Sequence, residues 1–555
     1  MSVPETFPKE IPPQTRQIVE SWLDKTSMFT FLGQHVDEIV GDADFAPLYA
    51  SGGRSGVNAV VLALVTVFQF LEDLPDRAAA EQARSRMDWK YALRQELTWS
   101  GFHYSDLCNF RKRLLAHDQA GLVFERVLDY LKSHGYIRAG GKQRTDATHV
   151  LGQLRQLSRL ELVLESLRLA LSALVSVDAH WFMQTLPATY TERYQGKRAD
   201  YRLNAAERDQ LLLQAGQDGV WLLQQLAQAP QLQGLEAVQV LQRVWHEQFS
   251  GEQVADIAID PEGDCEDGPI QSPHDPEARY GRKRGKDWQG YKAQVTDTAD
   301  DGPHFITDIH ITAANVSDQQ ALAGIQGRLQ QRALRPAKQY VDQAYLGGAA
   351  LASSRQQGID LRGYVQSQAS SKAPGFRLQD FTIDMAQQVA ICPTGQQSVQ
   401  WSTVSGTKGV AYRAFFGQQC RDCPFFNDQQ CTTQRGGRRL DISRHHDELQ
   451  RRRHEMQDPA FQREMHTRHG VEGTLSELVR CHGLRRARYR GQVKIQFQAY
   501  FAAAAFNLKH LVKACLFLLL ACQHTVFRHF SQWAAQQTSI FQQDHLSRPL
   551  GKIFG

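Results

Sequence analysis

The chain has 555 residues, of which 42% are hydrophobic and 22% charged. This length predicts roughly two to four domains, and the composition excludes a largely disordered chain. The formal net charge of only +4 does not by itself indicate a nucleic-acid partner. The start of the chain does not resemble a signal peptide, and the longest apolar stretch, 511–522, is too short for a membrane span. We therefore expect a cytoplasmic protein whose nine cysteines are free thiols or metal ligands, with no membrane partner.

Residues 1–140 are predicted to form an N-terminal all-α domain, because apolar residues recur at helical spacing. Its short helices and the Arg-Lys-Arg run at 111–113 are typical of a helix-turn-helix DNA reader. They fit a plain helical bundle equally well, so both interpretations stay open.

A short strand around Asp146 is predicted within residues 141–155, where Thr and Val surround a single acid. Residues 156–275 read as a Leu-, Ala- and Gln-rich helical insertion that ends in an acidic, Pro- and Gly-rich linker. No catalytic cluster is visible there, which favours a scaffold or dimer surface.

The remaining chain divides into four predicted segments. Residues 276–370 contain two strand-like runs, a helix and a short strand, which predicts a mixed sheet once the helical insertion is set aside. Residues 371–440 are irregular and β-rich with spaced cysteines, and residues 441–520 are helical. The tail, 521–555, is Gln-rich and gives no functional indication.

Three acidic residues stand at the ends or starts of predicted elements. Asp146 lies in the strand-like RTDATH, Asp342 ends the strand in QYVDQAYL, and Glu472 opens the helix in GVEGTLSELVR. Carboxylates are the ligands that Mg²⁺ prefers, and two such ions can cleave a phosphodiester. The pattern alone does not select these three from 59 acidic residues, and Glu464 and Glu477 are rival third carboxylates.

Two basic clusters flank these acids. Six Lys or Arg lie between Arg279 and Lys292, and residues 432–494 hold fifteen Lys and Arg against eight Asp and Glu. The planar guanidinium group matches phosphate oxygens, which favours a phosphate-binding channel over two solvated faces. The candidate DNA-binding residues are Arg282, Lys283, Arg284, Lys286, Arg480, Arg485, Arg486, Arg488 and Arg490.

Four cysteines form a second candidate site. Cys420 and Cys423 make a CxxC pair, with Cys392 before it and Cys431 after it. Four thiolates can bind Zn²⁺ tetrahedrally, but four reduced thiols would show the same spacing. The spare ligands are His445, His446 and His454.

The blocks DATHVLGQLRQLSRLE, SPHDPEARYGRKRGKDWQGYKAQVTDT, YVDQAYL and GVEGTLSELVRCHGLRRARYRG occur in this order. Together with the N-terminal helical part, they resemble the DDE-type transposases of bacterial insertion sequences over residues 25–510. The resemblance implies that Asp146, Asp342 and Glu472 are the catalytic triad. It implies a ribonuclease-H-like mixed α/β core with a Cys-bearing insertion before the catalytic Glu.

The resemblance also implies two Mg²⁺ or Mn²⁺ ions held by the triad, DNA as partner, and a homodimer on DNA in the bacterial nucleoid. Water would cut the element's ends, and the freed 3′ hydroxyl would then attack target DNA. Related families place a Lys about two turns after the Glu; Arg480 is the nearest substitute here. Thr148, His149 and Tyr345 are supporting residues at most.

Two alternatives remain. A ribonuclease-H-like nuclease would cut without joining, and a transposase-derived protein would bind DNA without catalysis. The sequence has no GxxxxGK[ST] loop and no HExxH helix, so we expect neither a nucleotide cofactor nor zinc proteolysis.

Overall fold

The computed structural model describes residues 6–515, except for the positions 25, 51–55, 195–202, 261–267, 284, 367–375, 406–410, 428–430 and 433. The chain forms two compact units. The first comprises Met1–Tyr136, Asp300–Phe305 and Tyr500–Gly555, and the second comprises Ile137–Ala299 and Ile306–Ala499. Among the described residues, no helix is long and apolar enough to cross a membrane.

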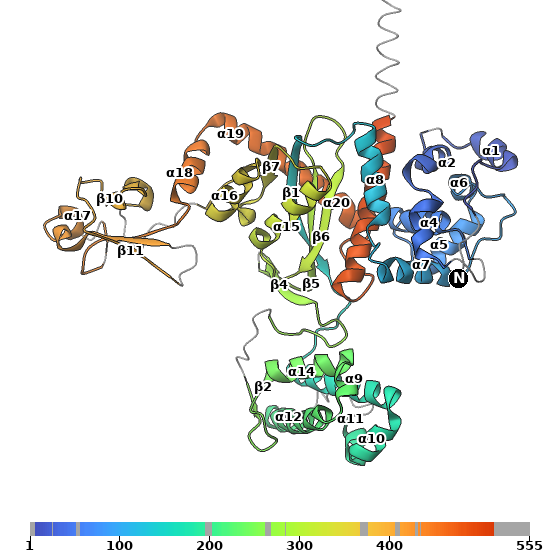
Figure 1. Cartoon of the computed structure of the whole chain (residues 1–555), viewed down its shortest axis with the longest axis horizontal. Helices are drawn as coiled ribbons and strands as arrows, with labels where there is room; N and C mark the ends of the chain where they lie inside the picture. The colour runs from blue at the N-terminus through green and yellow to red at the C-terminus, as the bar shows by residue number, and fades with distance from the viewer. Residues whose placement is uncertain are drawn as a thin grey trace, which may run out of the picture. The chain divides into compact units, whose positions relative to one another are not determined.

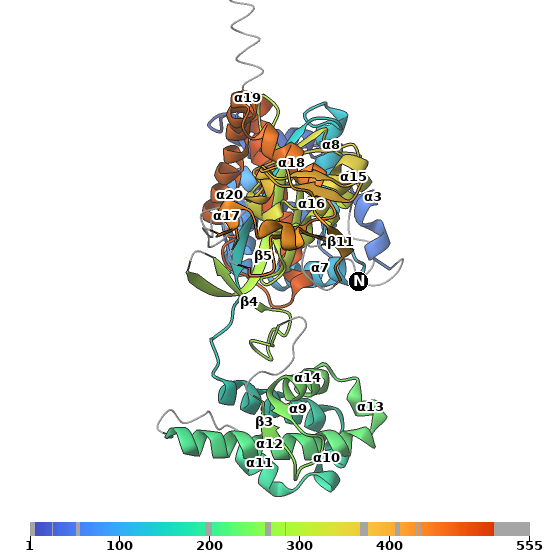
Figure 2. The ribbon, with the colours of Figure 1, turned by 90° about the vertical axis from the view of Figure 1, so that its left-hand side faces the viewer.

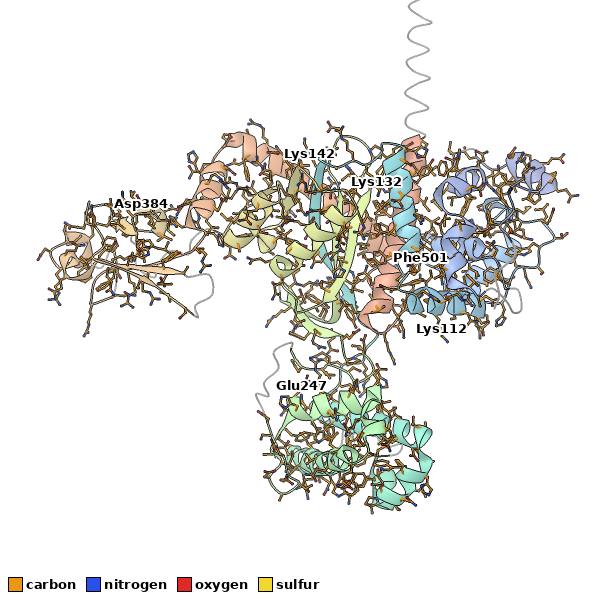
Figure 3. All side chains as sticks on the ribbon, viewed as in Figure 1. Lys112, Lys132, Lys142, Glu247, Asp384 and Phe501 are labelled. Atoms are coloured by element: carbon orange, nitrogen blue, oxygen red, sulfur yellow. The ribbon has the colours of Figure 1, made fainter. Side chains whose placement is uncertain are left out.

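The first unit is a helical bundle built around α4. Helix α4 is apolar at nearly every position, so residues from Ala59 to Phe70 are buried on all its sides. Figure 3 shows the side chains of this bundle, with Lys112 and Lys132 labelled. Its helices are α1 (Pro13–Glu20), α2 (Met28–Ile39), α3 (Asp42–Phe45), α4 (Ala59–Leu71), α5 (Asp76–Ser85), α6 (Met87–Ala92), α7 (Ser105–Ala116) and α8 (Leu122–Ser133).

The Arg-Lys-Arg run lies on α7, and its three side chains have different surroundings. Arg111 is buried and donates a 2.9 Å hydrogen bond to Asp76 of α5. The guanidinium of Arg113 stacks 4.2 Å above the ring of Tyr49. Only Lys112 of the three is exposed. Two members of this run therefore hold the bundle together.

The second unit is built on a mixed sheet of six strands, drawn in Figure 1. In the order β6-β5-β1-β7-β8, β1 pairs antiparallel with β5 and parallel with β7, and β4 pairs with the start of β5. The strands are β1 (Lys142–Leu151), β4 (Arg279–Lys283), β5 (Lys286–Thr298), β6 (Ile306–Ala313), β7 (Lys338–Val341) and β8 (Asp360–Arg362).

Helices cover the two faces of this sheet, and strand alternation decides what each face presents. Thr145 of β1 and Gln339 of β7 face α15 (Asp318–Gln331), whose Gln326 hydrogen-bonds to Gln339. Arg144 and Tyr340 point to the opposite face, which is covered by α19 (Pro459–Glu464), η5 (Met465–His469) and α20 (Gly470–Cys481). Asp146 and Asp342 each lie two residues further along and so belong to this second face.

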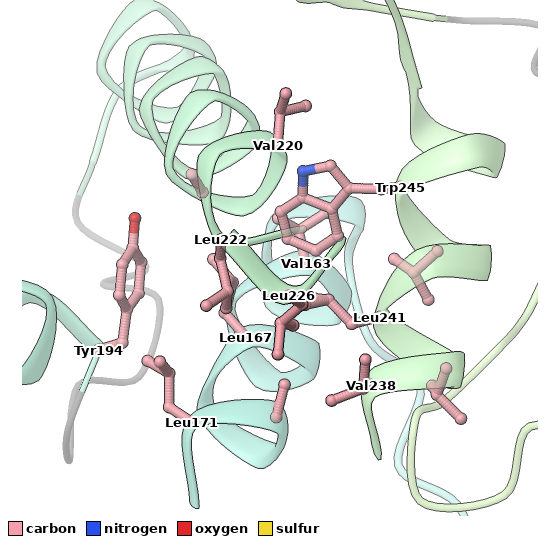
Figure 4. Close-up of a cluster of buried hydrophobic side chains, with 14 of the residues drawn as sticks. Val163, Leu167, Leu171, Tyr194, Val220, Leu222, Leu226, Val238, Leu241 and Trp245 are labelled. Carbon is pink, nitrogen blue, oxygen red and sulfur yellow. The ribbon is translucent and has the colours of Figure 1, made fainter. Parts of the chain in front are cut away.

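The helical insertion has its own hydrophobic core. Figure 2 shows its helices grouped together, and Figure 4 shows Trp245 among apolar side chains of α9, α12 and α14. The indole N–H of Trp245 donates to the carbonyl of Gly216 at 2.9 Å. The elements are α9 (Arg159–Val177), α10 (Ala179–Thr185), α11 (Ala188–Tyr194), α12 (Ala205–Ala227), α13 (Pro230–Gln233), α14 (Glu236–Gln248), β2 (Phe249–Ser250) and β3 (Ala258–Ile259).

The end of the predicted linker is tied into the second unit. Asp275 is buried and accepts a 2.5 Å hydrogen bond from the Tyr291 hydroxyl of β5. The backbone N–H of Gly491 donates to the same carboxylate at 3.2 Å. A buried carboxylate needs such donors, so this part of the chain is anchored rather than a free linker.

Short strands make up the Cys-bearing part, the region of residues 376–442. A hairpin pairs β9 with β10, and β11, β12 and β13 form a three-stranded sheet. Their bounds are β9 (Thr382–Asp384), β10 (Val389–Ile391), β11 (Gln400–Thr403), β12 (Tyr412–Phe415) and β13 (Arg439–Ile442). The other helices are α16 (Gly348–Gln356), α17 (Pro424–Asn427), α18 (His446–Glu455) and residues 492–515. The short 3-10 helices are η1 (Ala46–Leu48), η2 (Gln343–Tyr345), η3 (Leu378–Asp380) and η4 (Gly417–Cys420).

The predictions of a mixed α/β protein and of an N-terminal helical region are confirmed. The tail 521–555 and Arg284 lie outside the described residues.

Candidate active site

Asp146 and Asp342 stand side by side because their strands are parallel neighbours. In the register of β1 and β7, Thr145 pairs with Val341, so the next residues on the two strands are Asp146 and Asp342. Asp342 caps the short helix that follows β7, accepting a 2.8 Å hydrogen bond from the N–H of Gln343. The backbone N–H of Ala147 donates to Asp146 at 2.7 Å.

Glu472 lies in the first turn of α20, as the sequence predicted, and one arginine links it to the strands. The guanidinium of Arg468 lies 3.5 Å from Asp146 and 3.4 Å from Glu472. The Glu472 side chain is 64% exposed, whereas that of Asp146 is only 15% exposed. Asp146 and Asp342 are thus adjacent, and Arg468 lies between Asp146 and Glu472.

Burial raises the pKa of Asp146, because a buried carboxylate is poorly solvated when ionised. The hydrogen bond from Ala147 and the charges of Lys283 and Arg468 lower that pKa, while the neighbouring Asp342 raises it. The net shift is upward. A cation placed between the two aspartates would offset the cost of ionising the buried Asp146 and the repulsion between the two carboxylates.

The helix that carries Glu472 is fixed to the sheet by a buried ion pair. Arg144 of β1 and Asp297 of β5 form a bidentate pair at 2.8 and 3.0 Å, and Asp297 is fully buried. Thr474 of α20 donates to the same carboxylate at 2.5 Å. Two residues after Glu472, α20 is therefore hydrogen-bonded to the strand beside β1.

The absence of a side chain at Gly470 leaves space for the Arg144 guanidinium. A Cβ at this position would come within 1.8 Å of the guanidinium of Arg144. The Arg144 Nη1 also donates to the carbonyl of Thr467 at 3.2 Å. The start of α20 is thus shaped around Arg144.

The two rival carboxylates are engaged elsewhere. Glu464 accepts hydrogen bonds from Lys338 at 2.7 Å and Tyr340 at 2.8 Å. Burial opposes its ionisation, but these donors prevail and lower the pKa of Glu464. Glu477 lies 3.8 Å from His482. Glu472, by contrast, shares the partner Arg468 with Asp146.

Among the supporting residues, Tyr345 is fully buried and donates a short hydrogen bond to Gln294 of β5. Burial raises the pKa of Tyr345 well above its usual range, so the hydroxyl stays protonated. His149 lies 5.4 Å from Trp288, ring centre to ring centre, and burial with nearby cations lowers its pKa. Thr148 is half-buried on β1.

The hairpin of β4 and β5 brings cations to the carboxylates. Lys283 pairs with Lys286 at its tip, and the charge of Lys283 acts on both Asp146 and His149. Arg282 is exposed and lies 3.4 Å from Asp287. These side chains could meet DNA phosphates beside the carboxylates.

The predicted arginines after α20 divide into two kinds. Arg485 donates to the carbonyl of His149 at 2.8 Å and is half-buried, which makes it an anchor for β1. Arg488 is also half-buried. The exposed members are Arg480, Arg486 and Arg490.

The four cysteines Cys392, Cys420, Cys423 and Cys431 all belong to the Cys-bearing part. Cys431 lies in its hydrophobic core, and Cys392 and Cys420 pack against that core. Of the spare ligands, His445 is the N-cap of α18, His446 is its buried first residue, and His454 lies further along it.

Within the described part of the chain, no three Cys, His, Asp or Glu side chains are already grouped as ligands of one metal ion. The donor chemistry at the carboxylates still fits Mg²⁺ or Mn²⁺. Asp146 and Asp342 offer adjacent oxygens, and Glu472 is exposed and joined to Asp146 only through Arg468.

The sequence did not reveal four residues that build this site: Arg144, Asp297, Arg468 and Thr474. Arg468 lies four residues before Glu472, a spacing that puts both on one helical face and could have been noticed. Asp297 and Arg144 meet across 153 residues, and no local pattern indicates their pairing.

Comparison with known protein families gives two matches. Residues 391–512 match the family described as Transposase DDE domain, and residues 17–113 match Transposase domain (DUF772). No curated protein and no solved structure matches the chain. Both families are transposase families, so the resemblance recognised in the sequence is confirmed.

Proposed function

We propose that this chain, whose two domain matches support an insertion-sequence DDE transposase, binds the ends of its element, cleaves DNA there and joins the freed 3′ end to target DNA. One observation carries this proposal. Asp146 and Asp342 are neighbours at the ends of paired parallel segments, and Arg468 forms ion pairs with both Asp146 and Glu472.

The proposed core is ribonuclease-H-like. Its support is the strand order β6-β5-β1-β7-β8, with three antiparallel strands followed by two parallel additions. Asp146 lies on the central strand β1, Asp342 directly follows its parallel neighbour β7, and the glutamate lies on a helix that packs on β1 and β5.

Asp146, Asp342 and Glu472 would hold Mg²⁺ or Mn²⁺, which supplies charge stabilisation at the scissile phosphate and activates the attacking oxygen. In cleavage, a water oxygen bonds to phosphorus and the bond to the 3′ oxygen breaks, leaving a 3′ hydroxyl. In joining, that hydroxyl attacks a target phosphodiester, and a target 3′ oxygen leaves.

The chain's own side chains do three things in this scheme. Lys283 and Lys286 attract phosphates to the edge of the site. The Arg144–Asp297–Thr474 network keeps Glu472 at a fixed distance from β1. Tyr345 remains protonated and holds Gln294, so it acts as a supporting residue; the proposed two-step mechanism needs no covalent enzyme intermediate.

The test mixes purified protein with a supercoiled plasmid that carries the element's ends, in Mg²⁺, Mn²⁺ or EDTA. Wild type should nick and join DNA only with metal, and Glu472→Gln should lose both activities. Glu477→Gln is the matched control, since it changes the same functional group five residues along the same helix.

Three other outcomes of this experiment would contradict the proposal, and each favours a different explanation. Cleavage that survives in Glu472→Gln would show that Glu472 is misassigned. Metal-dependent nicking without joined products would favour a ribonuclease-H-like nuclease. Specific binding of the ends without any cleavage would favour a transposase-derived DNA-binding protein. A dimer on DNA is expected, and sedimentation with paired ends would measure it.

A further inference from the structure

The Cys-bearing part has a very small hydrophobic core. Seven buried side chains form it in the described residues: Phe381, Ala390, Ala414, Phe416, Cys431, Leu440 and Ile442. The core of the helical insertion contains 26 buried side chains by the same measure. Small folds with so little buried apolar surface usually need a disulfide or a metal ion for stability.

The four cysteines lie on loops and turns around this core. Cys431 belongs to it and is 9% exposed, while Cys392 and Cys420 pack against it. Cys423 follows Cys420 by one turn, in which the Cys423 N–H donates to the Cys420 carbonyl at 3.1 Å. One compact part of the chain therefore collects four sulfurs from three separate loops.

A tight turn presents Cys392. Its sulfur accepts a 3.3 Å hydrogen bond from the Gln396 N–H, and its carbonyl accepts one from Gly395 at 2.8 Å. Gly395 has φ of +86°, which favours glycine there. Backbone N–H donors to sulfur stabilise the thiolate, the form of cysteine that binds metal.

Arg438 holds the loop that carries Cys431. Its guanidinium donates to the Cys431 carbonyl at 2.7 Å and to the Phe376 carbonyl at 3.0 Å. The Cys431 loop is therefore tied by hydrogen bonds to the start of the Cys-bearing part.

We propose that Cys392, Cys420, Cys423 and Cys431 bind one structural Zn²⁺ ion that holds the Cys-bearing part together. Four sulfur ligands suit zinc, and a closed set without a water ligand is typical of structural rather than catalytic sites. Three of the four cysteines belong to or pack against one small core, and Cys423 lies one turn from Cys420, but the described residues form no ready ligand group. Zinc binding should therefore draw the loops together, coupling metal binding to folding.

The test is the zinc content of the full chain, purified under reducing conditions and measured by elemental mass spectrometry. We expect about one zinc per chain, because four thiolates complete one tetrahedral site. Cys420→Ser combined with Cys423→Ser should lose it. Cys481→Ser is the matched control, because Cys481 is an exposed thiol at the end of α20, and it should keep the zinc.

A second measurement does not depend on how the variant folds. Wild-type protein refolded with Co²⁺ should show the visible bands of tetrahedral cobalt and its sulfur-to-metal charge transfer. Removing the metal with a chelator should speed proteolysis within 376–442 while leaving the helical insertion resistant.

Three results would overturn the proposal: wild-type protein with four free thiols and no zinc, a disulfide among these cysteines, or zinc retained by the double variant. All readouts are separate from DNA cleavage, so an inactive transposase would leave this inference standing.

Discussion

The carboxylate site and the cysteine cluster assemble their groups in opposite ways. Asp146, Asp342 and Glu472 are separated by 196 and 130 residues; the sheet makes the two aspartates adjacent, and a buried ion pair fixes the helix that carries Glu472. The four cysteines lie within 40 residues, on turns around a core of seven buried side chains.

This difference indicates whether the fold around each site can form without the ligand of that site. The large core can form without the three carboxylates, and it then has to tolerate the burial of Asp146 and its repulsion by Asp342. The small core cannot bury enough apolar surface, so its metal would be part of its folding. We therefore expect substitutions at the two sites to act with opposite signs on stability.

The largest effect should come from the ion pair that fixes α20. Asp297→Ala leaves Arg144 buried without its partner, which should lower the free energy of unfolding by about 3–5 kcal/mol. Urea unfolding of the full chain would measure it. Asp287→Ala, which removes a half-exposed carboxylate on the same strand, should cost less than about 1 kcal/mol. Equal losses in the two variants would show that the network does not stabilise the sheet.

A smaller loss of stability is expected at Thr474, where the role of positioning α20 can be tested separately from the role in stability. Thr474→Val removes the hydroxyl donor to Asp297 and should cost about 1–3 kcal/mol, because a buried acceptor loses a partner. The rate of DNA cleavage should fall while DNA affinity holds, and Thr474→Ser should restore the rate. A Val variant that cleaves normally at a temperature where it is folded would refute the positioning role.

The local parts of the carboxylate site could be predicted from the sequence. Asp146 and Asp342 follow β-branched and aromatic residues, which predict strands, and Glu472 begins a periodic helical pattern; the structure has a strand or helix at each of these places. The resemblance to DDE transposases then selected these three from 59 acidic residues.

Contacts between distant segments could not be predicted in the same way. Arg111 looked like part of a DNA-binding run, but it pairs with Asp76 on another helix. Arg485 was grouped with phosphate-binding residues, and it is bonded to the carbonyl of His149. A charged residue's role depends on its neighbours in space, and charge clusters in a sequence do not reveal them.

The third effect should have the opposite sign. Burial raises the pKa of Asp146 above its unfolded value, so the ionised carboxylate destabilises the fold at pH 7. Asp146→Asn should therefore raise the melting temperature at pH 7 while abolishing cleavage. The gain should shrink as the pH falls through the raised pKa, since wild type then becomes neutral as well. Asp287→Asn, at a half-exposed site, should show little gain at any pH, and a destabilised Asp146→Asn would contradict the burial argument.

The smallest effect on stability should come from Arg468, whose substitution should change metal binding at the carboxylate site more than it changes stability. Its two ion pairs are long, at 3.4 and 3.5 Å, so Arg468→Gln should lower the free energy of unfolding by less than Asp297→Ala, which breaks a bidentate pair. Its effect should appear in metal binding, because the guanidinium and a divalent cation compete for Asp146 and Glu472. Calorimetric titration of the DNA-free protein with Mn²⁺ should show several-fold tighter binding in Arg468→Gln, with Arg486→Gln unchanged. Weaker binding in Arg468→Gln would mean that Arg468 orients the carboxylates for the ion. Metal binding at the carboxylate site would then depend on the surrounding side chains, as we propose for the cysteine cluster.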